Sequence, residues 1–191
     1  MKGWWYLNPK VFTPAECAEL VAYGMTKNPV VATVGHGSSS EVRPIRTSTV
    51  RWLDSAAVEL KPLVSRLEKL FFEANVKMFG FDYHSFHELQ FTEYLASNAG
   101  HYDWHEDNCW VPNAATADVF DRKLSLVVQL SAPESYAGGR LELERDNLKD
   151  TQFVNQGDVI IFPSFLRHRV TPVTSGVRYS LVSWVKGPRF K

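Results

Sequence analysis

The chain has 191 residues, 45% of them hydrophobic, and its 21 basic and 21 acidic side chains give a formal net charge of zero. This length suffices for one domain with a sizeable core, and the neutral balance argues against charge-driven binding to nucleic acid or to a membrane surface. No apolar run predicts a membrane span, the first ten residues lack a signal-peptide core, and only two cysteines, Cys17 and Cys109, suggest a reducing cytoplasm.

The first part of the chain is predicted to be helical. Residues 13–16, Thr-Pro-Ala-Glu, match a capping box with proline at the first helical position, which predicts a helix to about Thr26. Residues 35–40 (GHGSSS) read as a loop, and residues 41–53 as extended chain. A second helix is predicted over about 61–75 from apolar residues at helical spacing. These apolar residues are Leu63, Val64, Leu67, Leu70 and Phe71.

From about residue 80 the pattern changes to short runs with alternating side chains. The clearest is LSLVVQLS, residues 124–131, where leucine and valine at even positions alternate with Ser125, Val127 and Gln129. About eight such runs, separated by turn residues, favour a β-sandwich or jelly roll. The helices precede the strands in the chain and are expected to buttress one sheet, so the predicted fold class is α+β and mainly β.

The stretch GHYDWHEDN, residues 100–108, contains His-x-Asp twice. Two cysteines cannot build a thiolate metal site, so a metal here would need imidazole and carboxylate ligands. Residues two apart on a strand point to the same side, so either pair could supply two ligands of a two-histidine, one-carboxylate Fe(II) site. Alternation leaves the choice open between His101 with Asp103 and His105 with Asp107.

The third ligand would come from another strand. His168, in FPSFLRHRV, is the late histidine to consider, and Arg178 follows ten residues later. An arginine beside an iron site suggests that it recognises a carboxylate through paired hydrogen bonds. Ser180, two residues beyond Arg178, is expected to face the same interior.

Together these segments resemble the Fe(II)/2-oxoglutarate-dependent dioxygenases, in their prolyl 4-hydroxylase-like branch. The resemblance covers about 85–188 and rests on YLASNAGHYDWHED, LSLVVQLS, YAGGRLEL and GDVIIFPSFLRHRVTPVTSGVRYSLVSW. The family pattern of Tyr, Gly, Tyr and His-x-Asp identifies His105 and Asp107 as the metal pair, with His168 as the third ligand. His101 and Asp103 are then expected at the mouth of the site or in a structural role.

The resemblance also implies a fold and a cosubstrate site. The fold is a double-stranded β-helix (jelly-roll) core over 81–188, supported by residues 1–80, in a single domain. Arg178 would pair with the far carboxylate of 2-oxoglutarate, with Tyr94 lining the pocket and Ser180 assisting. Gln129 stands where some relatives have a cosubstrate-binding tyrosine, and its amide could donate a hydrogen bond there.

The implied activity is that of a hydroxylase that uses Fe(II), O2 and 2-oxoglutarate, forms succinate and CO2, and is supported by ascorbate. Its expected substrate is a proline in a protein, a peptide or the free amino acid. One alternative is an oxygenase of the same superfamily that acts on another small metabolite or side chain. Another is a cupin-like module that binds metal without catalysis. No nucleic-acid or membrane partner is expected, and the sequence indicates no oligomeric state.

Two segments are candidates for the walls of the site. Residues 111–123 are long for a plain connection and are predicted to form a lid over the substrate, with residues 35–46 as a second wall. Arg43, Arg46 and Arg51 either contact an anionic or peptide substrate or belong to a solvated strand edge.

Overall fold

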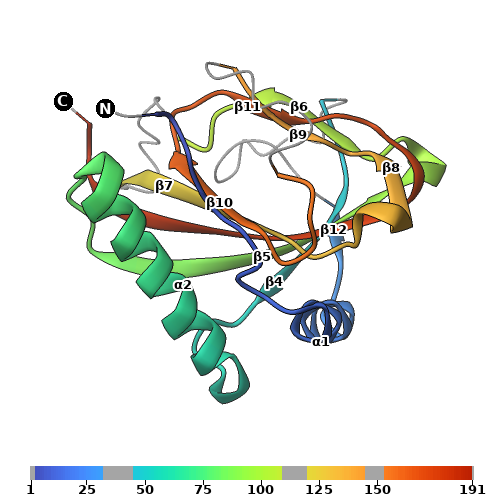
Figure 1. The fold of residues 1–191 in the computed structure, drawn as a ribbon, viewed down its shortest axis with the longest axis horizontal. Coiled ribbons are helices and arrows are strands. Elements are labelled where there is room, and N and C mark those ends of the chain that lie inside the picture. The colour runs from blue at the N-terminus through green and yellow to red at the C-terminus, as the bar shows by residue number, and fades with distance from the viewer. Residues whose placement is uncertain (1–2, 32–44, 109–119, 145–152, 191) are drawn as a thin grey trace.

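The computed structural model describes residues 3–31, 45–108, 120–144 and 153–190 (Figure 1). Two α-helices, α1 (Pro14–Met25) and α2 (Lys61–Ala74), accompany the strands and the short helical turns. The turns are η2 (Val58–Leu60), η3 (Asn75–Phe79), η4 (Ala96–Asn98) and η5 (Pro133–Ser135). The strands are β1 (Tyr6–Asn8), β2 (Val30–Val31), β3 (Arg46–Thr47), β4 (Thr49–Leu53), β5 (Ser85–Leu95), β6 (His101–His105), β7 (Phe120–Gln129), β8 (Tyr136–Gly138), β9 (Leu141–Leu143), β10 (Val159–Pro163), β11 (His168–Val170) and β12 (Val173–Pro188).

The strands form two antiparallel sheets. The larger sheet has the order β1-β10-β7-β12-β5-β4-β2, with β8 also paired to β12, and the smaller has the order β3-β6-β11-β9. Both helices lie on one side of the larger sheet and the smaller sheet lies on the other (Figure 1). This arrangement confirms the predicted α+β, mainly β jelly roll with N-terminal buttressing helices.

The first helix begins as its capping box predicts. Thr13 Oγ1 accepts a hydrogen bond from the backbone N–H of Glu16 at 3.2 Å, and Glu16 Oε2 accepts one from the backbone N–H of Thr13 at 2.8 Å. Pro14 occupies the first turn, where no N–H donor is needed. The predicted second helix is confirmed as α2, and its inward face is buried as the spacing indicated. The buried residues of α2 are Leu63, Leu67, Leu70, Phe71 and Ala74.

We expect Thr13→Ala to lower the free energy of unfolding by about 1 kcal/mol, because the N–H of Glu16 loses its acceptor. Urea unfolding followed by circular dichroism measures this change. Thr13→Ser is the matched control and keeps the hydroxyl, so its midpoint should stay near that of the parent protein. Equal losses in the two variants would show that the hydroxyl does not carry the effect.

The larger sheet separates two apolar clusters. On β7, Leu124, Leu126 and Val128 belong to the cluster beneath the helices, whereas Val127 belongs to the cluster between the sheets. The predicted alternation therefore holds, although both faces of this strand are buried. The inter-sheet layer also carries polar side chains, and the candidate site lies there.

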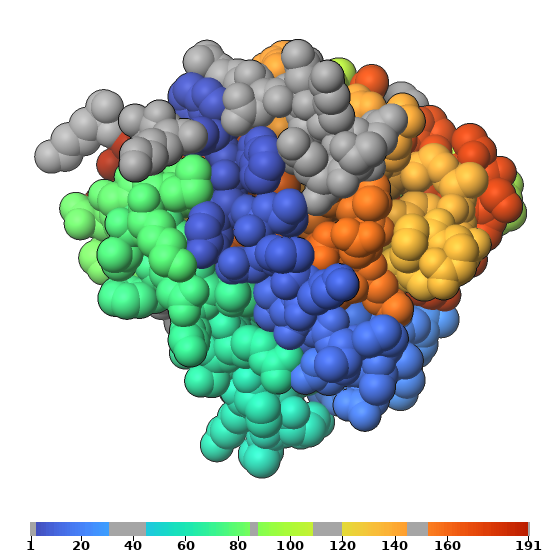
Figure 2. Space-filling model, viewed as in Figure 1, coloured from blue at the N-terminus to red at the C-terminus, as the bar shows by residue number. Residues whose placement is uncertain are grey.

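The N-terminal segment closes one side of the fold. β1 pairs with β10, Trp4 and Trp5 pack against the inter-sheet cluster, and Tyr6 packs against the cluster beneath the helices. Figure 2 shows this segment in blue, lying between the green atoms of the α2 region and the orange atoms of the β10 region. The aromatic residues at the start of the chain thus anchor it to the core.

Two predicted walls fall largely outside the described residues. Of the predicted lid at 111–123, residues 111–119 are not described and residues 120–123 already belong to β7. Of the second segment at 35–46, only residues 45 and 46 are described. None of the helices in the described ranges combines the length and apolar character needed to cross a bilayer.

Candidate metal centre and its cavity

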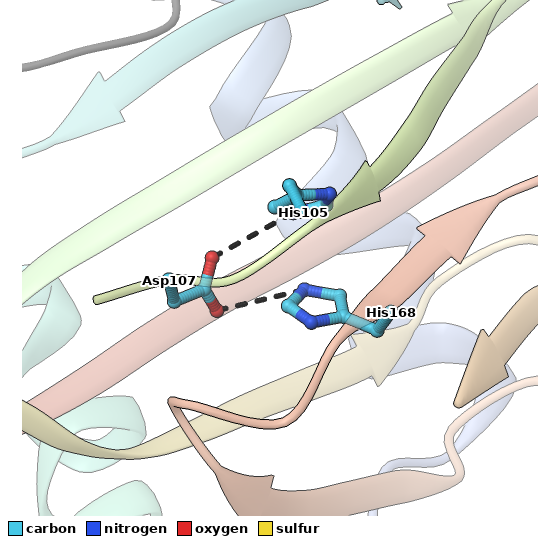
Figure 3. A group of neighbouring side chains, drawn as sticks. All are labelled: His105, Asp107 and His168. Atoms are coloured by element: carbon cyan, nitrogen blue, oxygen red, sulfur yellow. Dashed lines mark ion pairs between the residues drawn. The ribbon is translucent and has the colours of Figure 1, made fainter. Parts of the chain in front are cut away.

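Three side chains with metal-binding atoms converge between the two sheets. His105 ends β6 and is paired directly with His168, the first residue of the neighbouring strand β11. Asp107 lies two residues beyond β6, with Oδ1 3.7 Å from His105 Nε2 and Oδ2 3.7 Å from His168 Nε2 (Figure 3). One ligand atom from each of the three lies within 4.8 Å of the others. Two neutral nitrogens and one carboxylate are a suitable donor set for Fe(II).

Both imidazole rings are held in one orientation. His105 Nδ1 lies 2.8 Å from the carbonyl oxygen of Asp103, and His168 Nδ1 lies 2.8 Å from that of Leu166. A carbonyl oxygen only accepts hydrogen bonds, so each Nδ1 carries a hydrogen, and Nε2 is the nitrogen whose lone pair a neutral ring can offer to a metal. Backbone carbonyls that fix histidine ligands in this way are typical of metal sites.

Asp107 ties the site to the larger sheet. Its Oδ2 accepts hydrogen bonds from Ser125 Oγ at 2.6 Å and from Trp184 Nε1 at 2.8 Å. Its backbone N–H donates to the carbonyl oxygen of Ser164 at 2.9 Å. With Oδ2 engaged by two donors, the carboxylate cannot rotate freely, and Oδ1 stays directed toward His105.

The protonation states favour metal binding at neutral pH. Burial, reinforced by His168 close by, lowers the pKa of His105 to about 3, so this ring is neutral at pH 7. Burial raises the pKa of Asp107, but attraction to His168, His105 and Arg122 outweighs it and holds the pKa at about 2. The carboxylate is therefore ionised, and no proton has to leave His105 or Asp107 before a cation binds.

The other His-x-Asp pair lies apart from this cluster. His101 Nδ1 lies 2.9 Å from the carbonyl oxygen of Ala99, and Asp103 is exposed with a carboxylate that accepts from the N–H of Trp104. The pairing of β6 with β11 shifts register between His168 and Val170, so ideal alternation does not continue along this strand. The geometry thus favours the second pair, the one that the family resemblance indicates.

The three side chains open into a cavity of about 470 Å³ between the sheets. Tyr94 and Arg178 line it from directly opposed positions on the neighbouring strands β5 and β12, and Ser180 follows on β12. Apolar side chains also line the cavity. They are Val127, Leu141, Val170 and Val182.

Arg178 is the largest side chain with less than 2% exposure in the described chain, and it is only 1% exposed. Its Nε donates to Gln129 Oε1 at 3.1 Å, and its guanidinium carbon lies 5.6 Å from the ring centre of Tyr94. Its Nη1 is buried without a hydrogen-bond partner in the described part of the chain. A buried cationic donor that lacks a partner is costly, so an anionic group placed beside Nη1 would be stabilised there.

Three of the four predicted cosubstrate residues line the cavity, and the fourth, Gln129, does not. Tyr94, Arg178 and Ser180 line the cavity, whereas the amide donors of Gln129 point to Tyr136 Oη at 2.9 Å and to the carbonyl oxygen of Ser131 at 3.2 Å. Gln129 therefore contacts Arg178 and supports it from behind the cavity wall.

The cavity also has polar residues beyond the predicted metal and cosubstrate residues; of these, the sequence singled out Arg46 but neither Trp184 nor Asn108. Trp184 could have been found, because it continues the alternation of β12 beyond Arg178 and faces the same cavity. Arg46 lines the cavity and stacks on Tyr102, with its guanidinium carbon 4.4 Å from the ring centre and Nη2 without a partner within the described ranges. Asn108 also lines the cavity with both polar atoms of its amide unpartnered among described residues.

Arg51 was predicted either to contact an anionic or peptide substrate or to lie at a solvated strand edge, and the structure shows neither role. It is buried and pairs with Glu93 on the neighbouring strand, with 2.9 Å between Nη1 and Oε2. Its role in the fold is therefore structural, away from substrate and from solvent.

Comparisons with known proteins agree with this geometry. A model of the 2OG-Fe(II) oxygenase superfamily matches residues 89–186. A PKHD-type hydroxylase of Hyphomonas neptunium is 40% identical over 102 residues, which is 51% of this chain and 44% of that protein, so the chain spans less than half of this relative's length.

Two solved structures share the fold at low sequence identity. The viral collagen prolyl hydroxylase of Paramecium bursaria Chlorella virus-1, solved as a 2OG complex, has a TM-score of 0.69 and 22% identity, over 97% of each chain. A prolyl hydroxylase from Trichoplax adhaerens, in complex with a peptide fragment of a hypoxia inducible factor oxygen degradation domain, has a TM-score of 0.74 and 17% identity. The match covers 96% of this chain and 84% of that one.

Proposed function

The chain belongs to the 2OG-Fe(II) oxygenase superfamily, and from this premise we propose that it is a prolyl 4-hydroxylase-like dioxygenase. One observation carries the proposal. Three metal-binding side chains and a buried, partly unpaired guanidinium line the same cavity. A metal site alone would be compatible with many protein families. The buried guanidinium of Arg178 in the same cavity favours a metal-bound ligand that also carries a carboxylate.

His105, Asp107 and His168 would hold Fe(II). Arg178 would bind the far carboxylate of 2-oxoglutarate, with Ser180 beside it on the same face of β12. The bound iron and cosubstrate supply the oxygen chemistry, with 2-oxoglutarate and O2 consumed to give succinate, CO2 and a hydroxylated product.

The chain's own contribution would be orientation and partial exclusion of water. Carbonyl oxygens fix both imidazoles, Ser125 and Trp184 fix Asp107, and the apolar side chains of the lining would reduce the space for water beside the iron. Residues 81–188 would form the catalytic core and residues 1–80 its support, in a single domain.

The proposed substrate is a proline-containing peptide or protein, with free proline as a smaller candidate. The peptide complex of the Trichoplax adhaerens enzyme supports a peptide for a protein of this fold. Arg46 and the 48%-exposed Trp52 line the same cavity and offer polar and apolar contacts to such a chain. Ascorbate support and a reducing, cytoplasmic location belong to the same proposal, and the neutral net charge favours a peptide over nucleic acid.

The activity is tested by incubating the protein with Fe(II), O2, ascorbate and 2-oxoglutarate and measuring succinate, with and without proline-containing peptides and free amino acids. We expect slow succinate formation alone and faster formation with a substrate that gains about 16 daltons, the mass of one oxygen atom. Metal binding without succinate formation, and without any absorbance change on adding 2-oxoglutarate, would point to the cupin-like binding module. A mass gain only on compounds without proline would redirect the proposal to another oxygenase of the superfamily.

We expect Trp184→Phe to weaken Mn(II) binding by roughly 10-fold, because Asp107 loses the indole donor that fixes its Oδ2. Titration of the metal-free protein with Mn(II) measures this loss. Trp104→Phe is the matched control, since Trp104 packs under Arg169, whose guanidinium carbon lies 4.9 Å from its ring centre, and its indole does not support Asp107. Equal affinity in the Trp184 and Trp104 variants would remove the indole from the support of the metal site.

A further inference from the structure

We propose that Gln129 is a positioning residue that sets the orientation of Arg178 and so tunes the preference for a dicarboxylate cosubstrate, an inference that rests on the proposed function. Gln129 is 1% exposed and lies at the end of β7, directly opposite Ser180 on β12. It sits behind the cavity wall, so it acts on a ligand only through Arg178.

The amide of Gln129 can take only one orientation. Arg178 Nε is a donor, so the atom facing it at 3.1 Å must be the acceptor Oε1. The carbonyl oxygen of Ser131 is an acceptor, so the atom facing it at 3.2 Å must be the donor Nε2. The second N–H of the same amide goes to Tyr136 Oη at 2.9 Å. All the amide hydrogens are therefore used inside the protein, and none is left for a ligand.

The partners of this amide are themselves fixed to the strand that carries Arg178. Ser131 Oγ accepts from the N–H of Tyr179 at 2.7 Å and donates to the carbonyl oxygen of Val177 at 3.3 Å. These two residues flank Arg178 on β12. The contacts thus form a closed loop from Arg178 through Gln129 and Ser131 back to β12, which ties the guanidinium to its own backbone.

The aliphatic part of Arg178 is confined from the other side. Gly139 has a positive φ of 58°, and an ideal Cβ there would lie 3.0 Å from Arg178 Cδ, 2.8 Å from Val173 Cγ2 and 3.4 Å from Tyr136 Cε2. The backbone at residue 139 therefore packs closely against the stem of the arginine. With the stem confined by Gly139 and Nε held by Gln129, the plane of the guanidinium is set, and Nη1 is the buried atom left for a ligand.

The test compares two ligands of equal chain length, 2-oxoglutarate and 2-oxopentanoate, which lacks the far carboxylate. Calorimetry measures their binding to the Mn(II)-loaded protein, so no turnover is needed. Relative to the parent protein, Gln129→Leu should weaken 2-oxoglutarate binding roughly 10-fold, as is typical when a supporting partner is removed, and leave 2-oxopentanoate binding unchanged. Tyr136→Phe removes only the hydroxyl that accepts one N–H of Gln129. It should also lower the preference for 2-oxoglutarate over 2-oxopentanoate, but by a smaller factor than Gln129→Leu.

Gln156→Leu is the matched control, because Gln156 also donates to a backbone carbonyl, that of Leu130 at 2.8 Å, but makes no contact with Arg178. It should leave both affinities unchanged. If both Gln129→Leu and Tyr136→Phe keep the parent preference, or weaken the two ligands equally, Gln129 has no positioning role. If the parent protein itself binds 2-oxoglutarate no better than 2-oxopentanoate, the cosubstrate assignment fails, and the role of Gln129 fails with it.

Discussion

His105→Ala and His168→Ala should each abolish Fe(II)-dependent succinate formation, because each removes one of three metal ligands. The loss of Mn(II) affinity should exceed the roughly 10- to 100-fold effect of removing a supporting partner. Each ring can offer its Nε2 to a metal, and the side chains of the other His-x-Asp pair, His101 and Asp103, are turned toward backbone atoms elsewhere. Neither can therefore replace the missing ligand. Asp107→Ala should show the same loss, since no other carboxylate joins this group in the described chain.

His101→Ala is the matched control and should keep most of the activity and the full metal affinity. Mn(II) titration and succinate formation are measured on the same preparations, with circular dichroism as a check of folding. A dead His101 variant beside an active His105 variant would reverse the assignment of the two His-x-Asp pairs. Full metal affinity in His168→Ala would remove the third ligand.

The sequence predicted those elements whose signals are local. The capping box at residues 13–16 and the apolar spacing of α2 depend on neighbours within one or two helical turns, and the structure confirms both helices. The alternation of β7 likewise follows from its own side chains. These local signals were enough for the fold class, because an alternating strand has an apolar face that must be covered and the N-terminal helices can cover it.

The details of the site depend on contacts between distant residues, which periodicity does not encode. On an ideal strand, residues 101, 103, 105 and 107 share a face, so alternation alone could not choose the metal pair. The choice depends on where β6 ends and on its shifted register with β11. Arg51 could not be placed either, because its partner Glu93 lies 42 residues away on the adjacent strand.

The hydrogen bonds that Gln129 donates were also not predictable from the sequence, although their acceptors are only a few residues away in the chain. The sequence shows an amide on the face of β7 that looks toward the smaller sheet, and an amide there could donate to a ligand. Its hydrogens instead go to Tyr136 and to the carbonyl oxygen of Ser131, which lie beyond the end of the strand. The turn that returns Tyr136 to this point has no periodic pattern from which its contacts could be predicted.

Arg178→Met should weaken 2-oxoglutarate binding by about 2–4 kcal/mol, or roughly 30- to 700-fold, because the far carboxylate loses a charged partner in a buried site. Methionine fills much of the same space, so the change tests charge and hydrogen bonding with little loss of packing. Calorimetry on the Mn(II)-loaded protein measures the affinity, and Mn(II) affinity itself should not change, since Arg178 contacts none of the three ligands in the described part of the chain. Arg178→Lys should fall between the parent and the methionine variant, because an ammonium keeps the charge but cannot form the paired contact.

The stability of the ligand-free protein separates a binding role from a structural one. In Arg178→Met the buried Nη1 without a partner disappears, which favours folding, while Gln129 Oε1 loses its donor, which opposes it. Each effect is about 1–3 kcal/mol, so the free energy of unfolding should change little while ligand binding falls. Added 2-oxoglutarate at about 100 times its dissociation constant should stabilise the Mn(II)-loaded parent by about 2.7 kcal/mol and the variant by far less. A variant that unfolds readily yet keeps its affinity for 2-oxoglutarate would make Arg178 a structural residue, and the cavity would then need another anchor for its acid.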